Sequence, residues 1–173
     1  MPQIDVERTY LELPSPAALR RAPAPATGDA ISLTLEHPCA TDTYRELYRA
    51  VGAGYAWHDR LAWSDAMLAE HLARASVHVW ILRVDGALAG YFELIGEEGG
   101  SVEIGYFGLI PAFHGRGLGK YLLTRAAEEA WALGATRVWL HTCTLDDPAA
   151  LPNYRARGFT PFRTERYVAQ LPD

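Results

Sequence analysis

Residues 102–133 impose the strongest constraint on the fold of this chain. A segment rich in β-branched and aromatic residues, 102–110, runs into a glycine-rich stretch, and a helical segment, 118–133, follows and ends at Gly134. A strand, a turn without side-chain bulk and a helix N-terminus direct free backbone N–H groups and the positive end of the helix dipole at one point. These residues therefore predict an anion site at the start of the helix.

Two familiar nucleotide-binding motifs do not match this loop. A dinucleotide fingerprint would need a third glycine at position 120 or 122, where Lys120 and Leu122 stand. A Walker loop would need glycine at position 114 and Ser or Thr at 121, but the chain has His114 and Tyr121. The loop is therefore expected to bind a different phosphate-bearing ligand.

The other segments predict a mixed sheet with helices on its faces, in a domain of the α/β (α+β) class. Alternating or β-branched runs predict strands at 6–13, 31–36, 77–84, 88–95, 102–110 and 137–142, and further strands within 159–170. Helical spacing predicts helices at 41–51, 64–74, 118–133 and 148–157. The first helix is expected to begin at a Thr41-Asp42 cap, and Asp85-Gly86 predicts a two-residue hairpin turn between antiparallel strands.

Length and composition set the class of protein. The 173 residues are 49% apolar and 21% charged, as expected for one globular domain at 31–173, preceded at 1–30 by a strand and a proline-rich arm. A net charge of -5 makes nucleic acid and anionic membranes poor partners. Cys39 and Cys143 lack metal-ligand spacing, and no apolar run is long enough to span a membrane. We therefore expect a cytoplasmic protein without a metal.

Two segments resemble motifs of the Gcn5-related N-acetyltransferase (GNAT) superfamily. The stretch 114–119, His-Gly-Arg-Gly-Leu-Gly, is similar to the acetyl-CoA loop Gln/Arg-x-x-Gly-x-Gly/Ala, with His114 at a position that mainly lends its backbone. The stretch 147–159 resembles the signature Asn-x-x-Ala-x-x-x-Tyr-x-Lys/Arg-x-Gly-Phe, with Asp147 in place of the usual asparagine. The resemblance implies acetyl-CoA as co-substrate and a mostly antiparallel, twisted GNAT-type sheet whose strands splay at the cofactor site.

The resemblance also implies which residues contact the cofactor. In the family a bulge, compatible here with Gly105 and Gly108, splays two parallel strands, and a backbone N–H near Leu109 would stabilise the oxyanion. The implied cofactor-binding residues are Phe107, Leu109, Ile110, His114, Gly115, Arg116, Gly117, Leu118, Gly119, Lys120, Asp147 and Tyr154.

Amide formation from acetyl-CoA needs a neutral amine, stabilisation of the oxyanion and a proton for the leaving thiolate. Glu103, eleven residues before His114, matches the catalytic glutamate of family members that resemble histone acetyltransferases, so we expect it to be the base, directly or through water. Glu93 on the neighbouring strand is the competing candidate, and Glu103 could instead be an edge-strand or substrate-binding carboxylate. Tyr154 matches the tyrosine that protonates the CoA sulfur, although a tyrosine on a short helix can also serve only in packing.

The acceptor site is the least specified part of the sequence. In the family the region between the first two helices lines this site, and the expected substrate-binding residues are Tyr55, Trp57, Asp59, Glu93 and His141. Rings beside a carboxylate suit a cationic or aromatic amine, but the tryptophans here could equally pack the helices together. His141 and Cys143 are only two ligands, so they are expected to form the wall of a cleft and not a metal site.

The leading hypothesis is an acetyl-CoA-dependent N-acetyltransferase that acetylates a primary amine of a small molecule or peptide by direct attack in a ternary complex. The alternative is a non-catalytic CoA-binding regulatory or interaction module of the same fold. A Rossmann-type nucleotide protein is disfavoured by the failed fingerprint and by the antiparallel hairpin. Residues 1–30 are expected to add a strand, form a dimer contact in a homodimer, or cover the cleft.

Overall fold

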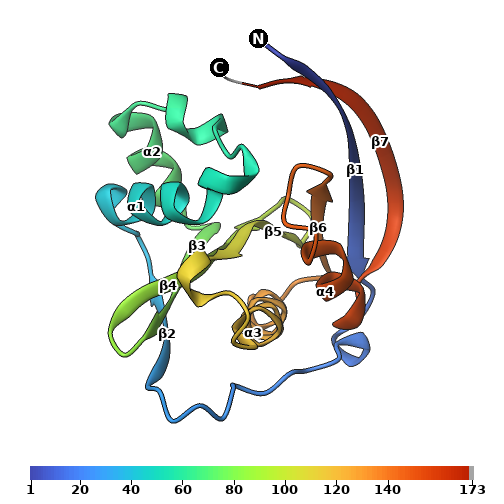
Figure 1. Ribbon diagram of the computed structural model, residues 1–173. Coiled ribbons are helices and arrows are strands. Elements are labelled where there is room, and N and C mark those ends of the chain that lie inside the picture. Colours follow the sequence, from blue (N-terminus) through green and yellow to red (C-terminus); the bar gives the residue numbers. More distant parts are fainter. Residues whose placement is uncertain (172–173) are drawn as a thin grey trace.

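The computed structural model describes residues 1–171, in which seven strands form one sheet with helices on both faces (Figure 1). The strands are β1 (Gln3–Leu13), β2 (Ile31–Glu36), β3 (Val77–Val84), β4 (Ala87–Gly96), β5 (Ser101–Leu109), β6 (Arg137–Cys143) and β7 (Thr160–Gln170). The helices are α1 (Thr41–Gly52), α2 (Asp65–Leu72), α3 (Leu118–Ala132) and α4 (Ala150–Ala156), with short 3-10 turns η1 (Pro16–Ala18), η2 (Ala53–Tyr55), η3 (Asp59–Ala62) and η4 (Pro111–Phe113).

The strand order is β2-β3-β4-β5-β6-β1-β7, and every described pairing is antiparallel except that of β5 with β6. This arrangement confirms the predicted class of fold. Asp85 and Gly86 have φ angles of 50° and 82°, as the predicted hairpin turn requires. Among residues 1–171, no helix combines the length and the apolar character needed to span a membrane.

The two helices before β3 begin in different ways. The predicted Thr41-Asp42 cap is wrong, because Ala40 is the N-cap residue, no side chain caps the helix, and Thr41 is already helical. Asp42 still lies in the first turn, where its charge favours the positive end of the helix dipole. Helix α2 is capped by Ser64, whose hydroxyl accepts a hydrogen bond from the Met67 N–H at 3.1 Å.

Strand β1 lies inside the sheet, between β6 and β7. Leu11 and Leu13 are fully buried in the core that includes α3, so β1 is part of the main sheet and not an appendage. The strands predicted within 159–170 form one long strand, β7, which bends where its register with β1 shifts between Tyr10 and Leu11. Figure 1 shows β1 and β7 as a curved pair that rises opposite α1 and α2.

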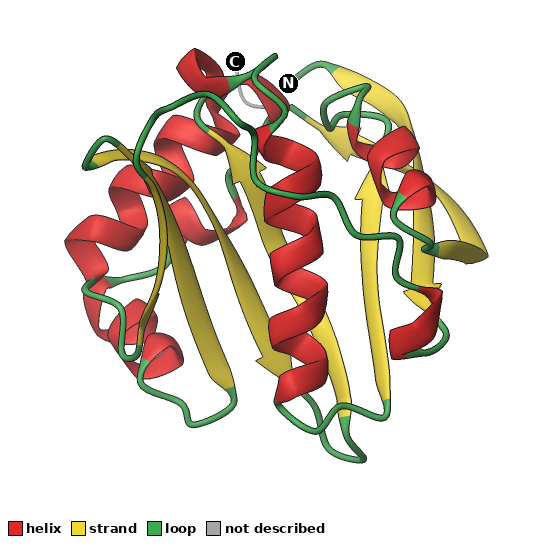
Figure 2. Cartoon of the chain, turned by 90° about the horizontal axis from the view of Figure 1, so that it is seen from below, coloured by secondary structure: helices red, strands yellow, loops and turns green. Residues whose placement is uncertain are grey.

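The proline-rich arm runs from β1 to β2 across α3 (Figure 2). The Ala22 N–H donates to the Thr124 hydroxyl of α3 at 2.9 Å, and the Arg20 N–H donates to the Arg157 carbonyl at 2.8 Å. Gly158 permits this close approach, since a Cβ at that position would lie 2.1 Å from the Ala18 carbonyl oxygen. The arm is therefore fixed against the face of the sheet that carries α3.

Two apolar cores hold the helices against the sheet. One core joins α3 and Tyr154 of α4 to residues such as Phe92 and Val138 of the sheet, and the other joins α1 and α2 to residues such as Val79 and Tyr91. Burial of these side chains is the main stabilising contribution to the fold. Helices α1 and α2 lie over β3 and β4 (Figure 1). The β1–β7 pair stands opposite these helices on the same face of the sheet.

Candidate active site

Strands β5 and β6 separate shortly after they pair. Their parallel register covers only Ser101–Glu103 with Arg137–Trp139. In the pairing of β4 with β5 the register shifts so that Gly105 is an extra residue on β5, which is a bulge. A Cβ at Gly105 would come within 2.7 Å of the Ile95 side chain, so glycine suits this position. The splay opens a cavity of about 990 Å³ between the strands.

The glycine loop closes one end of this cavity. Gly117 is the N-cap of α3 with a φ angle of 76°, and it has no side chain to cap the first N–H groups of the helix. Gly115 has a φ angle of 75°, and a Cβ there would meet nothing within 4 Å. The residues of the loop that line the cavity are His114, Gly115, Gly117, Leu118, Gly119 and Lys120. The helix start therefore faces open space with its positive end.

Two of the expected cofactor residues lie outside the cavity lining. Arg116 turns away, with its guanidinium 5.2 Å from the centre of the Phe113 ring. The Ile110 N–H donates to the Ala89 carbonyl at 2.7 Å, and its side chain packs against the core of α1 and α2. Phe107 and Leu109, by contrast, lie on the cavity wall.

Tyr154 reaches the cavity from α4 and is only 7% exposed. Its ring packs against Phe107 and Phe159, with centroids 6.2 Å and 6.3 Å away, so it serves in packing as well. Burial raises the pKa of the Tyr154 hydroxyl, and the charges of Asp146 and Asp147 act in the same direction. The hydroxyl therefore keeps its proton at neutral pH and can donate it.

Glu103 projects into the same cavity from β5, beside the point where the strands separate. Burial raises its pKa to about 7, and the charges of Glu97 and Glu93 add to this effect while Arg60 and Arg8 oppose it. A carboxyl group with this pKa is partly ionised near neutral pH, so it can both accept a proton and release it.

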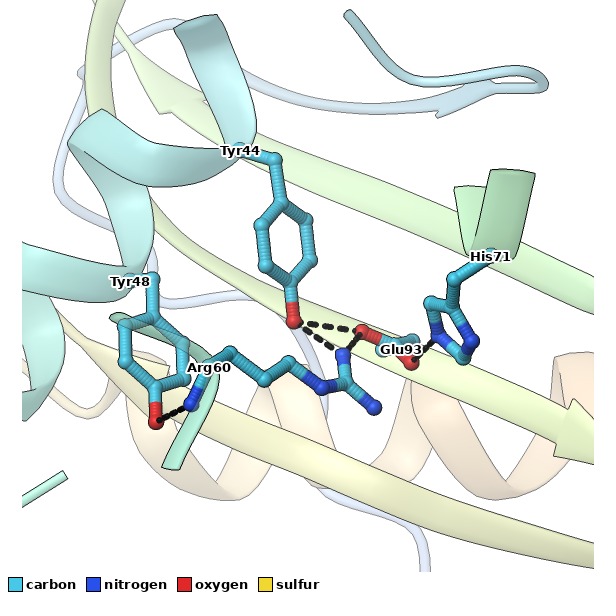
Figure 3. A network of polar contacts seen from close by, with 5 residues as sticks. All are labelled: Tyr44, Tyr48, Arg60, His71 and Glu93. Atoms are coloured by element: carbon cyan, nitrogen blue, oxygen red, sulfur yellow. Dashed lines mark hydrogen bonds and ion pairs between the residues drawn. The ribbon is translucent and has the colours of Figure 1, made fainter. Parts of the chain in front are cut away.

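Glu93 lies instead in a buried polar cluster, not on the cavity wall where a substrate contact was expected (Figure 3). It is fully buried; Tyr44 donates to its Oε1 at 2.6 Å, and His71 Nε2 lies 2.8 Å from its Oε2. Arg60 donates to both Glu93 and the Tyr44 hydroxyl. Burial opposes ionisation, but the His71 contact and the Arg60 charge hold the pKa of Glu93 below its usual value. Glu93 therefore holds the Arg60 side chain in position, and Arg60 lies over Glu93 on the cavity wall.

Aromatic side chains surround Arg60 at the other end of the cavity. Trp57 packs against Tyr48 and Tyr106, at centroid distances of 5.6 Å and 5.0 Å, and also lines the cavity. The Arg60 guanidinium lies 4.5 Å from the centre of the Tyr106 ring and 4.9 Å from that of Trp63. Trp57 thus both packs the helices together and forms part of the cavity wall. The faces of Tyr106 and Trp63 are already in contact with the Arg60 cation.

The remaining expected acceptor residues also line the cavity. Tyr55 and Asp59 come from the segment after α1, and the Asp59 side chain is 81% exposed, with His58 Nε2 3.8 Å away. His141 lies on β6, where burial lowers its pKa and the charge of Arg8 acts in the same direction. Within residues 1–171, no three His, Cys, Asp or Glu side chains are grouped so that they could hold a metal ion.

Sequence reasoning missed the contribution of β1 and β7. Arg8 of β1 and Tyr167 of β7 line the cavity and are joined by a hydrogen bond of 3.1 Å. Arg60 and Asn153, whose side-chain amide donates to the Gly119 carbonyl at 3.3 Å, also line the cavity and are not among the predicted site residues. Alternation along 6–13 places Arg8 on one face of a strand, but nothing in that segment tells which strands flank it.

Solved structures of acetyltransferases share this fold. A GCN5-related N-acetyltransferase from Kribbella flavida has a TM-score of 0.66 and 21% identity, over 99% of this chain and 60% of that one. An aminoglycoside acetyltransferase from an uncultured soil metagenomic sample has a TM-score of 0.63 and 17% identity, over 73% of this chain and 86% of that one.

Proteins with similar sequences are also named as N-acetyltransferases. An uncharacterized N-acetyltransferase of Mycobacterium bovis is 35% identical over 77 residues, which are 44% of this chain and 49% of that protein, and two Mycobacterium tuberculosis strains have relatives with the same values. The match thus spans about half the length of these relatives. The model of the acetyltransferase (GNAT) family matches residues 40–159, a range that includes the glycine loop, Glu103 and Tyr154. The chain therefore belongs to the acetyltransferase (GNAT) family.

Proposed function

We propose that this protein is an N-acetyltransferase that transfers the acetyl group of acetyl-CoA to a primary amine of a small molecule or peptide. The observation that carries the proposal is that Glu103 and Tyr154 face one cavity between splayed strands, whose end is formed by the glycine loop. An acid, a base and an anion cradle in one cavity are the parts that acyl transfer from a phosphorylated donor needs.

The residues at the helix start fit the diphosphate of CoA. The uncapped N–H groups of α3 and the Lys120 ammonium would bind it, since both favour negative charge. A Cβ at Gly119 would lie 3.8 Å from Leu109 and 4.0 Å from Asn153, so this position has room for a small residue only. Beyond Glu103, the backbone of β5 has left β6 and would pair with the extended pantetheine arm. Bound acetyl-CoA would supply an activated acyl thioester.

The chain supplies the proton transfers. An alkylammonium with a pKa of about 10 cannot attack a thioester until it loses a proton, and Glu103, which lines the cavity, would accept that proton. Tyr154, kept protonated by burial, would donate its proton to the sulfur as the C–S bond breaks, and the second proton lost by the attacking nitrogen would restore the phenol. With an acceptor bound, the aromatic side chains around Trp57 would limit the access of water to the thioester.

The test of this proposal separates cofactor binding from chemistry. Wild-type protein should bind acetyl-CoA in calorimetry and release free thiol when a panel of primary amines is added. Tyr154→Phe should lower kcat about 10-fold to 100-fold with little change in acetyl-CoA affinity, because the ring that packs against Phe107 is kept. Tyr121→Phe, on α3 outside the cavity lining, is the matched control.

Three outcomes distinguish the hypotheses. Failure to bind acetyl-CoA at millimolar concentration would refute the proposed donor. Binding without thiol release for any amine would favour the alternative, a non-catalytic CoA-binding module. An unchanged kcat in Tyr154→Phe would remove Tyr154 from the role of acid, while leaving the acetyltransferase activity itself supported.

A further inference from the structure

Arg8 is a cavity cation without a carboxylate partner. The arginine and lysine side chains that line the cavity are Arg8, Arg60 and Lys120. Arg60 is paired with Glu93, and Lys120 lies at the helix start where the proposed diphosphate would bind. Within residues 1–171, no carboxylate oxygen lies within the 4.0 Å of an ion pair from Arg8. Its neighbour Arg166, by contrast, pairs with Glu7 at 3.0 Å.

The contacts of Arg8 are neutral hydroxyls and a ring. It donates to the Tyr167 hydroxyl at 3.1 Å and lies 3.5 Å from that of Tyr10, and its guanidinium stands 4.9 Å from the centre of the Tyr167 ring. Its Nε is buried and has no hydrogen-bond partner. A guanidinium stays charged in proteins and offers five donors in a planar fork, so Arg8 retains unused capacity for an oxyanion.

Arg8 also faces the same part of the cavity as the proposed base. Its charge lowers the pKa of Glu103 and contributes to the lowered pKa of His141, so the three side chains are within electrostatic range. The cross-strand register places Arg8 opposite Cys143 on β6, and Cys143 and His141 alternate onto one face of that strand. An acceptor whose amine reaches Glu103 therefore extends toward Arg8.

The other charges at this end form no ion pair with Arg8, and Glu165 reaches it only through the Tyr10 hydroxyl, which donates to Glu165 at 2.9 Å. Glu93 is already paired with Arg60, and Glu103, with its pKa of about 7, carries only part of a charge at neutral pH. Asp59 points largely into solvent, where its charge is screened. The faces of Tyr106 and Trp63 are in contact with Arg60. Asp146, which also lines the cavity, is engaged by the Thr142 hydroxyl and the Cys143 N–H. Arg8 is therefore the cation at this end that a negatively charged group of a ligand can still pair with.

We propose that the acceptor is a primary amine that also carries an oxyanion, a carboxylate or a phosphate, and that Arg8 binds this group. The inference rests on the proposed function, because it concerns the second substrate of that reaction. It distinguishes this chain from enzymes that acetylate polycationic amines, because such amines have no anionic group that an arginine could bind. Arg8 is accordingly a determinant of specificity, since it would bind the acceptor remote from the reacting amine.

The test compares matched acceptors with and without the anion. ω-Amino acids of increasing length are compared with their neutral amides, and phosphoethanolamine with ethanolamine, at equal concentrations of free amine. For wild-type protein we expect kcat/KM to favour the anionic member by about tenfold or more, as a charge-assisted bidentate contact would provide. The amino acid and phosphate pairs separate the two kinds of anion.

Variants show whether Arg8 causes the preference. Arg8→Gln should bring the anionic-to-neutral ratio close to one, mainly through KM for the anionic acceptor, while Arg8→Lys should keep part of it. Arg166→Gln makes the same chemical change on β7, at a side chain that is 84% exposed and outside the cavity lining, and should leave the ratio unchanged. A ratio is insensitive to a general loss of folded enzyme, so a purely structural role of Arg8 would not move it.

Equal rates for anionic and neutral acceptors in the wild type, or a ratio that Arg8→Gln does not change, would overturn this inference. Efficient acetylation of aminoglycosides without any anionic preference would do the same, and in both cases the proposed acetyltransferase activity would stand. Absence of acetyl-CoA binding and of thiol release with every amine would instead refute the proposed function. The two failures are thus distinguishable.

Discussion

The Tyr55 hydroxyl donates a hydrogen bond of 2.8 Å to the Asp147 carboxylate. Tyr55 ends η2, after α1, whereas Asp147 lies between β6 and α4, so the bond joins two walls of the cavity that come from distant parts of the chain. Burial raises the pKa of Tyr55 to about 12, and the contact with Asp147 acts in the same direction. Asp147 also accepts the Ala149 N–H, and these contacts hold its pKa below the usual value. At neutral pH the pair is therefore a phenol bonded to a carboxylate.

Removing this hydroxyl should loosen the segment that covers the acceptor end. In Tyr55→Phe we expect amide hydrogen exchange in residues 53–63 to become about fivefold faster, because a solvent-accessible hydrogen bond of this type contributes about 1 kcal/mol. Exchange in α3 should not change, since that helix is anchored in the other core. Exchange measured by mass spectrometry checks both regions. Unaltered protection at 53–63 would show that packing alone holds the segment.

The pKa of Glu103 should appear in the pH profile of activity. Below about pH 7 the carboxyl gains its proton, so wild-type kcat/KM should fall towards tenfold per pH unit. Dividing the profile by that of Glu103→Gln, measured with the same acceptor, cancels the protonation of the acceptor amine. The quotient should inflect near pH 7. Glu97→Gln removes a like charge that raises the pKa of Glu103, so it should move the inflection to lower pH. A quotient without an inflection would exclude Glu103 as the base.

The same raised pKa predicts that Glu103 reduces stability at alkaline pH. Between its ordinary value of 4.5 and about 7, the folded protein binds a proton that the unfolded chain has lost. Stability therefore decreases as pH rises through this window, and the loss is complete above it. Glu103→Gln should raise the melting temperature at pH 8 and leave it nearly unchanged at pH 4. Calorimetric melting at both pH values is the measurement, and a larger gain at pH 4 would contradict the sign.

Gly119→Ala should raise stability and leave ligand affinity nearly unchanged. Alanine is favoured over glycine within a helix by about 0.5–1 kcal/mol, so α3 and the protein should become more stable. The added methyl would make ordinary contacts with Leu109 at 3.8 Å and Asn153 at 4.0 Å, and the motif that the loop resembles accepts alanine here, so we expect acetyl-CoA affinity to change by less than about threefold in calorimetry. Gly54→Ala, where a Cβ would meet nothing within 4 Å, is the control for glycine replacement. A loss of affinity of about tenfold in Gly119→Ala would show that the loop does not bind its ligand as the motif implies.

Local patterns were sufficient for most of the fold. Hydrophobic periodicity located the strands and helices, and Asp85-Gly86 gave the hairpin, because these signals depend on neighbouring residues only. The cap of α1 was predicted wrongly because threonine is a good cap residue, whereas the backbone of Thr41 is already helical. Helix ends are the least certain part of a helix when they are read from sequence. The position of β1 between β6 and β7 depends on pairing over long sequence separations, which no local pattern encodes.

The residues of the candidate site likewise differ in whether a local pattern encodes them. The glycine loop, Glu103 and Tyr154 could be located because they lie in short motifs with fixed spacing. Arg8 could not, since its place beside the cavity follows from the order of the strands. Glu93 was predicted to contact the substrate but does not line the cavity. Alternation along the strand puts Glu93 on the same sheet face as the cavity. The segment after α1, however, folds over Glu93 and places Arg60 between it and the opening.

The buried Glu93–Arg60 pair should therefore matter for stability and for the acceptor end together. Glu93→Gln keeps the shape but leaves Arg60 buried without its counter-charge, so we expect the free energy of unfolding to fall by about 3–5 kcal/mol at pH 7. Because the folded pKa of Glu93 is lowered, its contribution is present above the unfolded value and is lost as pH falls through the folded one. The difference between wild type and variant should accordingly shrink under acid conditions.

Urea unfolding at neutral and acid pH measures this difference, with Glu7→Gln as the control for a surface pair. Glu7 bonds the largely exposed Arg166 at 3.0 Å, and an exposed pair of this kind contributes about 1 kcal/mol or less. Since Arg60 lies against Trp63 and Tyr106 on the cavity wall, the Glu93 variant should also raise KM for the acceptor while that for acetyl-CoA changes little. A loss of stability as small as that of the control would mean that water or Tyr44 compensates the Arg60 charge, and the acceptor KM should then remain at its wild-type value.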